Sequence, residues 1–433
     1  MTATIKENLT WSSSTQIIIL LISVLGSVIL SRRLGVEARG IYMLALTTST
    51  FVTALVGGNA MLFAFTYTVG KNQNDVETIA AQAIWFFTIA ILISSIILFL
   101  LPISLFQKFL PGVNNFQLAL IILHANCQNI FSYHVGILAG DNKIRLSAQL
   151  SLFVAMFGLC LQVVLLFLFD LGLPGALWSL AGISACKLLV VFSNLKKRYQ
   201  VFSFPDFKLI KSISKYAVKH YPSHFAIVFV NNIDSYILAS VSGPAAVGVY
   251  SLAKGLAQTM DNIEQPISRA INPTVVSGNL DRSAQVVVKA LRMTLLISFF
   301  AAIVAASFSP WIIPSIYGKD FSGAVLPFVI LVFGSVLAAT RMLFNFFSLQ
   351  LGKPEYATVI SIGMAMISLP VFYFFTHRLG LIGTAIAMTL LLLIRSIISI
   401  FFFLHKTKLK LPGLIVRMRD INQLLSRILR KPT

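Results

Sequence analysis

Apolar segments long enough to cross a membrane recur along the whole chain, each bounded by charged residues, glycine or proline. A helix needs roughly 20 apolar residues to span the hydrocarbon core of a bilayer. Backbone polar groups inside that core must pair within their own segment, so the segments are expected to be helices. The pattern predicts twelve spans, at residues 14–31, 41–64, 79–101, 116–138, 146–169, 174–194, 216–241, 247–271, 288–313, 323–349, 355–376 and 381–404.

The composition is typical of an integral membrane protein. Of the 433 residues, 57% are hydrophobic and 11% are charged, whereas soluble domains carry about 25% charged residues. No polar stretch is long enough for a separate soluble domain. The sequence therefore predicts an all-α, multi-pass integral membrane protein.

The basic residues predict the orientation of the spans. Lysine and arginine number 34 against 14 acidic residues, a net charge of +20. In a membrane protein such an excess collects in cytoplasmic loops, so we expect no nucleic-acid partner. With both termini in the cytoplasm, most basic residues fall on the inside. The outside loops then hold only Arg32, Arg33, Arg39, Lys108, Lys319 and Arg378.

The charge pattern also predicts the domain organisation. A basic cytoplasmic linker at 196–215 separates a six-span half at 1–195 from a six-span half at 216–405. The remaining segment, 406–433, reads as a basic amphipathic helix. Such a helix is expected to lie on anionic lipid at the membrane surface.

The two halves resemble each other at an offset of 208 residues. The segment that begins at Gly35 and the segment that begins at Gly243 both fit G-x-x-A-x-G-x-Y-x-L-A. The stretch LGLPG from Leu171 likewise matches LGLIG from Leu379. Six spans are an even number, so the halves share one orientation and are related by a pseudo-two-fold axis along the membrane normal. Transporters built in this way alternate access to a central cavity.

A polar stripe runs along span eight. Residues that recur every three or four positions share one face of a helix, and ionisable groups at membrane depth are expensive enough to be functional candidates. The stripe consists of Lys254, Gln258, Asp261, Gln265 and Arg269, with Asn262 and Glu264 beside it.

Span seven carries a second polar face, with His220, His224, Asn231 and Asp234. Counted from the turn near residue 244, Asp234 and Lys254 lie at the same depth. We therefore expect the two faces to line a hydrated cavity between the halves. The alternative is a buried ion pair that only fixes the register of the two helices.

Three further basic residues lie inside apolar spans. Lys187 and Arg395 are equivalent in the repeat, and each is expected either to line a cavity or to reach the inner headgroups with its charged end. Arg341 is a cavity candidate in span ten, with hydrogen bonding between helices as the alternative. Span four is unusually polar, with His124, Asn126, Gln128, Asn129 and His134.

Catalytic and metal-binding patterns are missing from the sequence. It contains no phosphate-binding loop and no H-E-x-x-H motif. No plausible catalytic triad can be identified, and the three cysteines have no metal-binding spacing. We therefore expect a protein that is not an enzyme and that has no cofactor or metal.

With its twelve spans in two halves, the chain resembles the polysaccharide-transporter family of membrane flippases, which includes the O-antigen and other lipid-linked oligosaccharide flippases. The resemblance extends to about residue 405. It rests on RRLGVEARGIYMLA after span one, SGPAAVGVYSLAKGL after span seven and LGKPEYATVIS at the start of span eleven. The family is similar in fold to multidrug and toxin extrusion transporters and to the lipid II flippase, which has two additional spans.

The resemblance implies transport of an undecaprenyl-pyrophosphate-linked oligosaccharide, such as an O-antigen repeat unit for lipopolysaccharide, to the outer leaflet of a bacterial inner membrane. It also implies membrane lipid, a polysaccharide polymerase and a chain-length regulator as partners. A pyrophosphate needs lysine or arginine donors, and a sugar needs amide partners. Accordingly, Lys254, Arg269, Arg341, Gln258, Gln265 and Asn231 are the expected substrate contacts. Asp234, Asp261 and Glu264 are expected to balance charge or to bind a coupling ion.

The main alternative is a cation-coupled multidrug efflux transporter of the related extrusion family. Such a transporter favours an acidic cavity for cationic drugs, whereas residues 14–31 contain no carboxylate and the cavity candidates are mostly basic. A major-facilitator transporter and a scaffold for glycan assembly are further alternatives. The basic signature of the former is absent between spans two and three, and the duplicated polar bundle argues against the latter.

Overall fold

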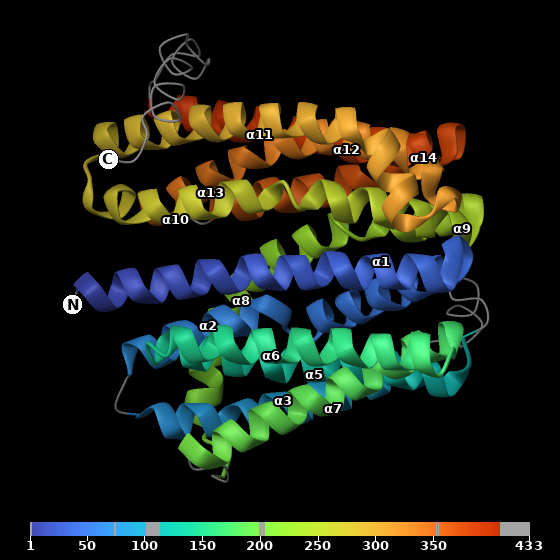
Figure 1. Cartoon of the computed structure of the whole chain (residues 1–433). Helices are drawn as coiled ribbons and strands as arrows, with labels where there is room; N and C mark the ends of the chain where they lie inside the picture. The colour runs from blue at the N-terminus through green and yellow to red at the C-terminus, as the bar shows by residue number, and fades with distance from the viewer. Residues whose placement is uncertain are drawn as a thin grey trace. The chain divides into compact units, whose positions relative to one another are not determined.

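The computed structural model describes residues 2–72, 75–100, 113–198, 204–351, 353 and 355–407. The predicted tail at 406–433 lies outside the described residues from residue 408 onward. In the described part, all regular elements are helices (Figure 1). They are α1 (Thr2–Leu55), α2 (Gly58–Lys71), α3 (Val76–Leu100), α5 (Asn115–Gly140), α6 (Ile144–Val163), α7 (Gly172–Arg198), α8 (Phe207–Val230), α9 (Ile233–Gln258), α10 (Asp261–Ser277), α11 (Leu280–Tyr317), α12 (Val325–Val336), α13 (Arg341–Leu349) and α14 (Glu355–Thr407).

Short helical turns of other types complete these elements. A π-helical turn, Val164–Leu168, extends α6, and 3-10 turns at Lys319–Ala324 and Leu337–Thr340 flank α12. Within the described residues, eight helical segments are long and apolar enough to cross a membrane. Three of them hold two predicted spans each, and α5 coincides with the predicted span at 116–138. The twelve predicted spans thus coincide with helices, with short breaks in spans two, seven and eight.

The chain divides into two compact units, Met1–Gly248 and Val249–Thr433. In the first unit α8 packs against α1, α2 and α3, which is why residues after the predicted linker at 196–215 group with the preceding helices. The boundary between the compact units therefore falls later in the chain than the predicted linker. The six-span halves, which are defined by the repeat, stay a prediction.

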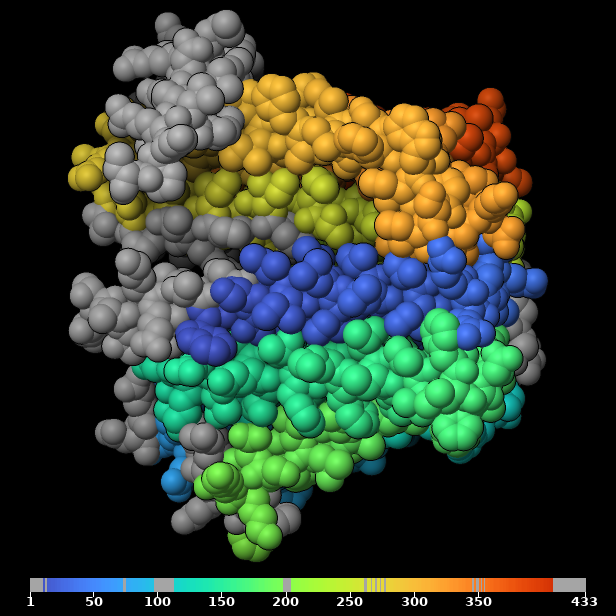
Figure 2. Space-filling model, in the orientation of Figure 1, coloured from blue at the N-terminus to red at the C-terminus, as the bar shows by residue number. Residues whose placement is uncertain are grey.

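The polar helix α5 is the centre of the first unit. It packs against α1, α2, α3, α6 and α7, and its Tyr133 and Ile137 join Phe65 of α2 in the apolar core. By contrast, α6 exposes large apolar side chains, including Phe153 and Phe157, and its residues form part of the surface in the space-filling view of Figure 2. In a membrane protein such exposed apolar side chains are expected to contact lipid.

The repeated motifs have the same backbone geometry in both copies. Gly35 has φ 69° and ψ −176°, and its equivalent Gly243 has φ 78° and ψ 175°. Gly172 and its equivalent Gly380 both have φ 54°. Glycine adopts these positive φ values without the steric cost that other residues meet. The internal repeat is therefore structural as well as sequential, and its glycines turn the chain between successive spans.

The second glycine of the main motif serves a different purpose, because it allows two helix backbones to touch. A Cβ atom on Gly40 would lie 1.8 Å from the carbonyl oxygen of Pro244, and one on Gly248 would lie 1.9 Å from the carbonyl oxygen of Val36. Equivalent residues of the repeat thus meet reciprocally where α1 crosses α9. Small residues permit this kind of close approach between membrane helices.

We expect Gly40→Ala and Gly248→Ala each to force the backbones of α1 and α9 apart and to destabilise the protein by about 1–3 kcal/mol. The effect should appear as a lower apparent melting temperature of the detergent-solubilised protein, followed by size-exclusion chromatography after heating. Gly255→Ala is the matched control, because a Cβ atom there meets nothing within 4 Å. Equal melting temperatures for all three variants would contradict the close-contact explanation.

Candidate functional site

The predicted polar face of span seven includes the point where α8 ends and α9 begins. Asn231 follows the last residue of α8 and is partly buried. Asp234 is fully buried in the first turn of α9, where its carboxylate accepts hydrogen bonds from the backbone N–H (2.7 Å) and hydroxyl (3.3 Å) of Ser235. The buried carboxylate is thus held by polar groups at a helix start.

The predicted polar face of span eight is divided between α9 and α10 of the second unit. Lys254 is partly buried, with its ammonium 5.7 Å from the centre of the Tyr250 ring. Gln258 and Gln265 are exposed, whereas Glu264 is buried. The face is therefore more polar and more accessible than a packed helix interface.

The remaining predicted contacts of the second unit are only partly described. The side chains of Asp261 and Arg269 lie outside the described residues. Arg341 begins α13 and is partly buried, with its Nε donating to the carbonyl oxygen of Ala338 at 3.4 Å. Asn231 and Asp234 belong to the first unit and the other predicted residues to the second, so their common cavity stays a prediction.

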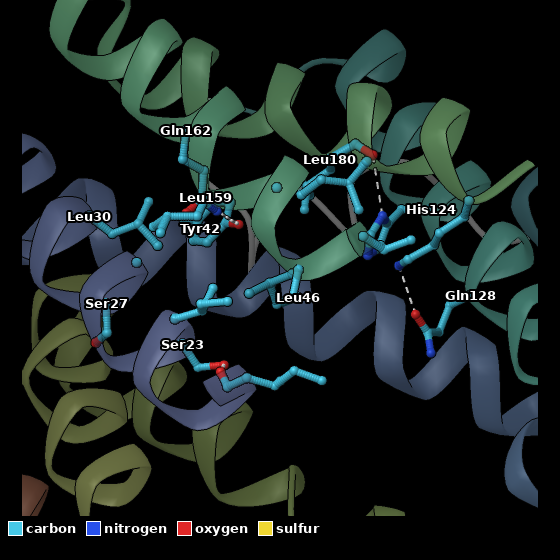
Figure 3. A pocket seen from close by; sticks show the side chains of 18 of the residues that line it. Ser23, Ser27, Leu30, Tyr42, Leu46, His124, Gln128, Leu159, Gln162 and Leu180 are labelled. Carbon is cyan, nitrogen blue, oxygen red and sulfur yellow. Dashed lines mark hydrogen bonds between the residues drawn. The ribbon is translucent and has the colours of Figure 1, made fainter. Parts of the chain in front are cut away.

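A cavity that the sequence did not predict lies in the first unit. It has a volume of about 470 Å³ and is lined by α1, α5, α6 and α7, mostly by apolar groups with polar side chains among them (Figure 3). This volume falls in the range of ordinary ligand pockets, about 300–1,000 Å³. Its polar lining consists of Ser23, Ser27, Arg39, Tyr42, His124, Gln128, Ser151, Gln162 and Lys187.

Arg39 lies at one side of this cavity, and the sequence-based prediction that it sits in an outside loop is wrong. It lies within α1 and is only 2% exposed. Because Gly35 reverses the chain, the guanidinium reaches back to the preceding segment, where Nη1 donates to the Ser27 carbonyl oxygen (3.0 Å) and Nη2 to the Ser27 hydroxyl (3.1 Å). It also donates to the Ser31 hydroxyl.

Lys187 of α7 lies at the opposite side, 6% exposed. Its ammonium donates to Oε1 of Gln128 on α5 at 2.7 Å, so the side chain is held inside the unit. His124, one turn before Gln128, contacts the Leu180 carbonyl oxygen (3.3 Å) and the Ser184 hydroxyl (3.1 Å) through Nδ1. Figure 3 shows His124 and Gln128 together, away from Ser27, Tyr42 and Gln162.

The cavity is positively charged. Among the described residues its lining contains Arg39 and Lys187 but no aspartate or glutamate. The other polar groups are neutral, such as Gln162, which donates to the Tyr42 hydroxyl at 3.4 Å. Cations attract anions and repel other cations, and they do so more strongly beside a protein surface than in bulk water. The arrangement can bind an anionic group, and it disfavours a cationic one.

Part of this cavity left a signal in the sequence. Ser23, Ser27 and Ser31 recur every four residues and so share one face of span one, which marks a polar stripe in an otherwise apolar helix. The polar residues of span four are also visible in the sequence. What the sequence could not provide is the packing of α5 on α7, which brings Gln128 to Lys187.

The break in span two is closed by side chains from α8. Between α1 and α2, Gly57 and Gly58 have φ values of 120° and 44°. The hydroxyl of Tyr221 donates to the carbonyl oxygen of Leu55 (3.0 Å), and the N–H of Asn59 donates to Nε2 of His224 (3.2 Å). His224, predicted as part of the polar face of span seven, therefore satisfies backbone groups that helix ends leave unpaired.

The fold matches solved membrane transporters. The lipid II flippase MurJ in an inward closed conformation superposes with a TM-score of 0.77 at 14% identity, covering 98% of this chain and 93% of that chain. An inward-facing MATE multidrug resistance transporter of the MOP superfamily gives 0.70 at 15% identity, covering 90% and 94%. The bent form of the Vibrio cholerae MATE transporter VcmN gives 0.60 at 15% identity, covering 94% and 98%.

At these identities the likeness concerns the fold, which is the all-helical, twelve-span, two-lobe fold of MOP-superfamily transporters. The three matched proteins are transporters or flippases, not enzymes. No curated protein matches the sequence. A family model described as "Polysaccharide biosynthesis protein" matches residues 5–278, which is more than half of the chain. The chain is therefore a multi-pass membrane protein that belongs to the polysaccharide biosynthesis protein family.

Proposed function

We propose that this protein is a flippase that moves an undecaprenyl-pyrophosphate-linked oligosaccharide to the outer leaflet of a bacterial inner membrane by alternating access. The observation that carries the proposal is the cavity of the first unit, which is lined by Arg39 and Lys187 and by no carboxylate. A pyrophosphate headgroup is anionic and is bound by such cations. Its lipid tail can stay in the bilayer while the headgroup crosses inside the protein.

Membership of a polysaccharide biosynthesis family supports a glycan as cargo, and the fold shared with the lipid II flippase MurJ supports a lipid-linked form of it. The cargo we propose is an O-antigen or another surface polysaccharide repeat unit, which places the protein in lipopolysaccharide or capsule-like glycan synthesis. A polymerase and a chain-length regulator are the proposed partners. The distribution of basic residues supports cytoplasmic termini.

Within this function, the residues predicted from the sequence keep their proposed roles. Charge-assisted donors for the pyrophosphate are Lys254, Arg269 and Arg341. Amide partners for the sugar are Gln258, Gln265 and Asn231. Charge balance or ion coupling is assigned to Asp234, Asp261 and Glu264. Asp234 and Glu264 are buried, and a buried carboxylate at membrane depth has a high free-energy cost.

Cation-coupled multidrug efflux is the second candidate, because MATE transporters share the fold. A cationic drug in the cavity of the first unit would meet two positive charges and no carboxylate among the lining residues. This electrostatic mismatch makes efflux the weaker proposal.

A transport assay separates the two candidates. In proteoliposomes, a fluorescent undecaprenyl-pyrophosphate-linked oligosaccharide should move between leaflets, as measured by its exposure to a membrane-impermeant glycosidase. Protein-free liposomes provide the background rate, and ethidium uptake under a proton or sodium gradient provides the efflux readout. Gradient-driven ethidium movement without movement of the lipid-linked glycan would contradict the flippase proposal.

Lys254→Ala and Arg269→Ala should each slow glycan flipping by on the order of tenfold or more, the effect of losing a hydrogen bond to a charged group. The measurement is the initial flipping rate at matched protein levels in proteoliposomes. Lys289→Ala serves as the matched control, because Lys289 is an exposed residue of the same unit. Flipping rates equal to that of this control would remove Lys254 and Arg269 from the substrate path.

The positive charge of the cavity can be measured directly. In a chain whose three native cysteines are replaced by alanine, Ser23→Cys should react faster with an anionic methanethiosulfonate reagent than with a cationic one, by several-fold to about tenfold after correction for intrinsic reactivity. Ser193→Cys, exposed on α7, gives the reference ratio. The same ratio at both positions would mean that the cavity does not select anions.

A further inference from the structure

The ammonium of Lys187 is buried, and none of the residues that the structure describes pairs it with a carboxylate. Among the described residues its hydrogen-bond acceptor is the neutral Oε1 of Gln128, and no carboxylate lines the cavity around it. An ammonium has three N–H donors, so this contact leaves donors for another acceptor. A buried charge is stable only when it is paired and hydrogen-bonded.

Arg39 adds to this positive charge from the other side of the cavity. Its guanidinium donates to oxygen atoms of Ser27 and Ser31, which accept hydrogen bonds but carry no charge. The two cations come from helices that are brought together only in the folded unit, α1 and α7. A cavity of about 470 Å³ between them has room for a phosphate or pyrophosphate group and several water molecules.

The neutral lining also suits an oxyanion. The amide of Gln162 lines the space, and its nitrogen has a second N–H beside the one that donates to the Tyr42 hydroxyl. The hydroxyls of Ser23 and Ser151 also line it, but they donate to the carbonyl oxygens of Ile19 and Ser147, so they must rotate to bind an anion. Figure 3 shows Ser23 and Gln162 on the side of the pocket away from Gln128. The described lining thus offers donors on both sides, whereas the negative charge must come from the ligand.

We propose that this cavity is an oxyanion-binding site inside the first unit, in which Lys187 binds a phosphate or pyrophosphate group and Arg39 contributes a second positive charge. The group is either the headgroup of a lipid-linked substrate or a free anion. The first of these sources rests on the proposed function, and the site itself does not. It is separate from the residues of spans seven, eight and ten assigned above.

The test measures binding of radiolabelled inorganic pyrophosphate to the full-length protein in nanodiscs of zwitterionic lipid. Lys187→Met removes the ammonium and should weaken binding by about tenfold to a hundredfold, whereas Lys187→Arg keeps the charge and should retain most of the affinity. Lys196→Met, an exposed lysine on the same helix, is the matched control and should bind as the wild type does.

A second variant keeps the test informative if Lys187→Met does not fold. Gln128→Glu is nearly isosteric and places a carboxylate next to the ammonium, so that the protein itself supplies the counter-charge. We expect this variant to fold and to lose pyrophosphate binding. Undiminished binding in Gln128→Glu, or in a folded Lys187→Met protein, would overturn the proposal, as would the absence of binding in the wild type at millimolar pyrophosphate.

Undecaprenyl pyrophosphate added to the nanodiscs identifies the source of the anion. Competition for the part of pyrophosphate binding that is lost in Lys187→Met assigns the site to the lipid headgroup, and lack of competition for that part assigns it to a free anion. The flipping assay separates this result from the proposed function. A Gln128→Glu protein that binds pyrophosphate and flips the glycan as the wild type does would overturn the binding site, and the flippase would then rest on the family and the fold alone. Pyrophosphate binding that depends on Lys187 in a protein that does not flip would overturn only the flippase.

Discussion

Every polar group that enters the bilayer must find its partner inside the protein, and this constraint governs the whole structure. It makes the spans helical and leaves few breaks in them. Where span two does break, Tyr221 and His224 of α8 reach across to the exposed backbone of Leu55 and Asn59. The same constraint ties Arg39 to the serines of span one and leaves Lys187, which donates to the neutral Gln128, able to gain from an anionic ligand.

The duplicated sequence supplies a duplicated scaffold, but it duplicates the charged residues only in part. Gly35 and Gly243 turn the chain in the same way, and Gly40 and Gly248 bring their helices into contact. The equivalent of Arg39, however, is Val247, whereas the equivalent of Lys187 is Arg395. The glycines are equivalent because backbone geometry is needed in both copies. The charged residues are free to differ because each half can serve a different part of one transport path.

The sign of the charge in the cavity matters more for function than the fold does. MurJ and the MATE transporters share this architecture at similarly low identity, so the architecture by itself is compatible with lipid-linked and drug-like cargo. A cavity that has two cations and no carboxylate among its described lining residues favours an anionic cargo over a cationic one, because the electrostatic energy of a cargo beside these cations changes sign with its charge.

The sequence by itself determined the twelve spans, the turns at the repeated glycines and the family, because span length, apolar composition and glycine positions are local properties of the chain. The sequence analysis misplaced Arg39, because a charged residue close to a predicted turn resembles a loop residue. The structure shows that the chain turns at Gly35 and that Arg39 lies buried in the helix after it. Only the tertiary structure grouped α8 with the first unit and brought Lys187 to Gln128. Those neighbours come from distant segments, and helix packing, which no single segment encodes, decides which side chains face the same space.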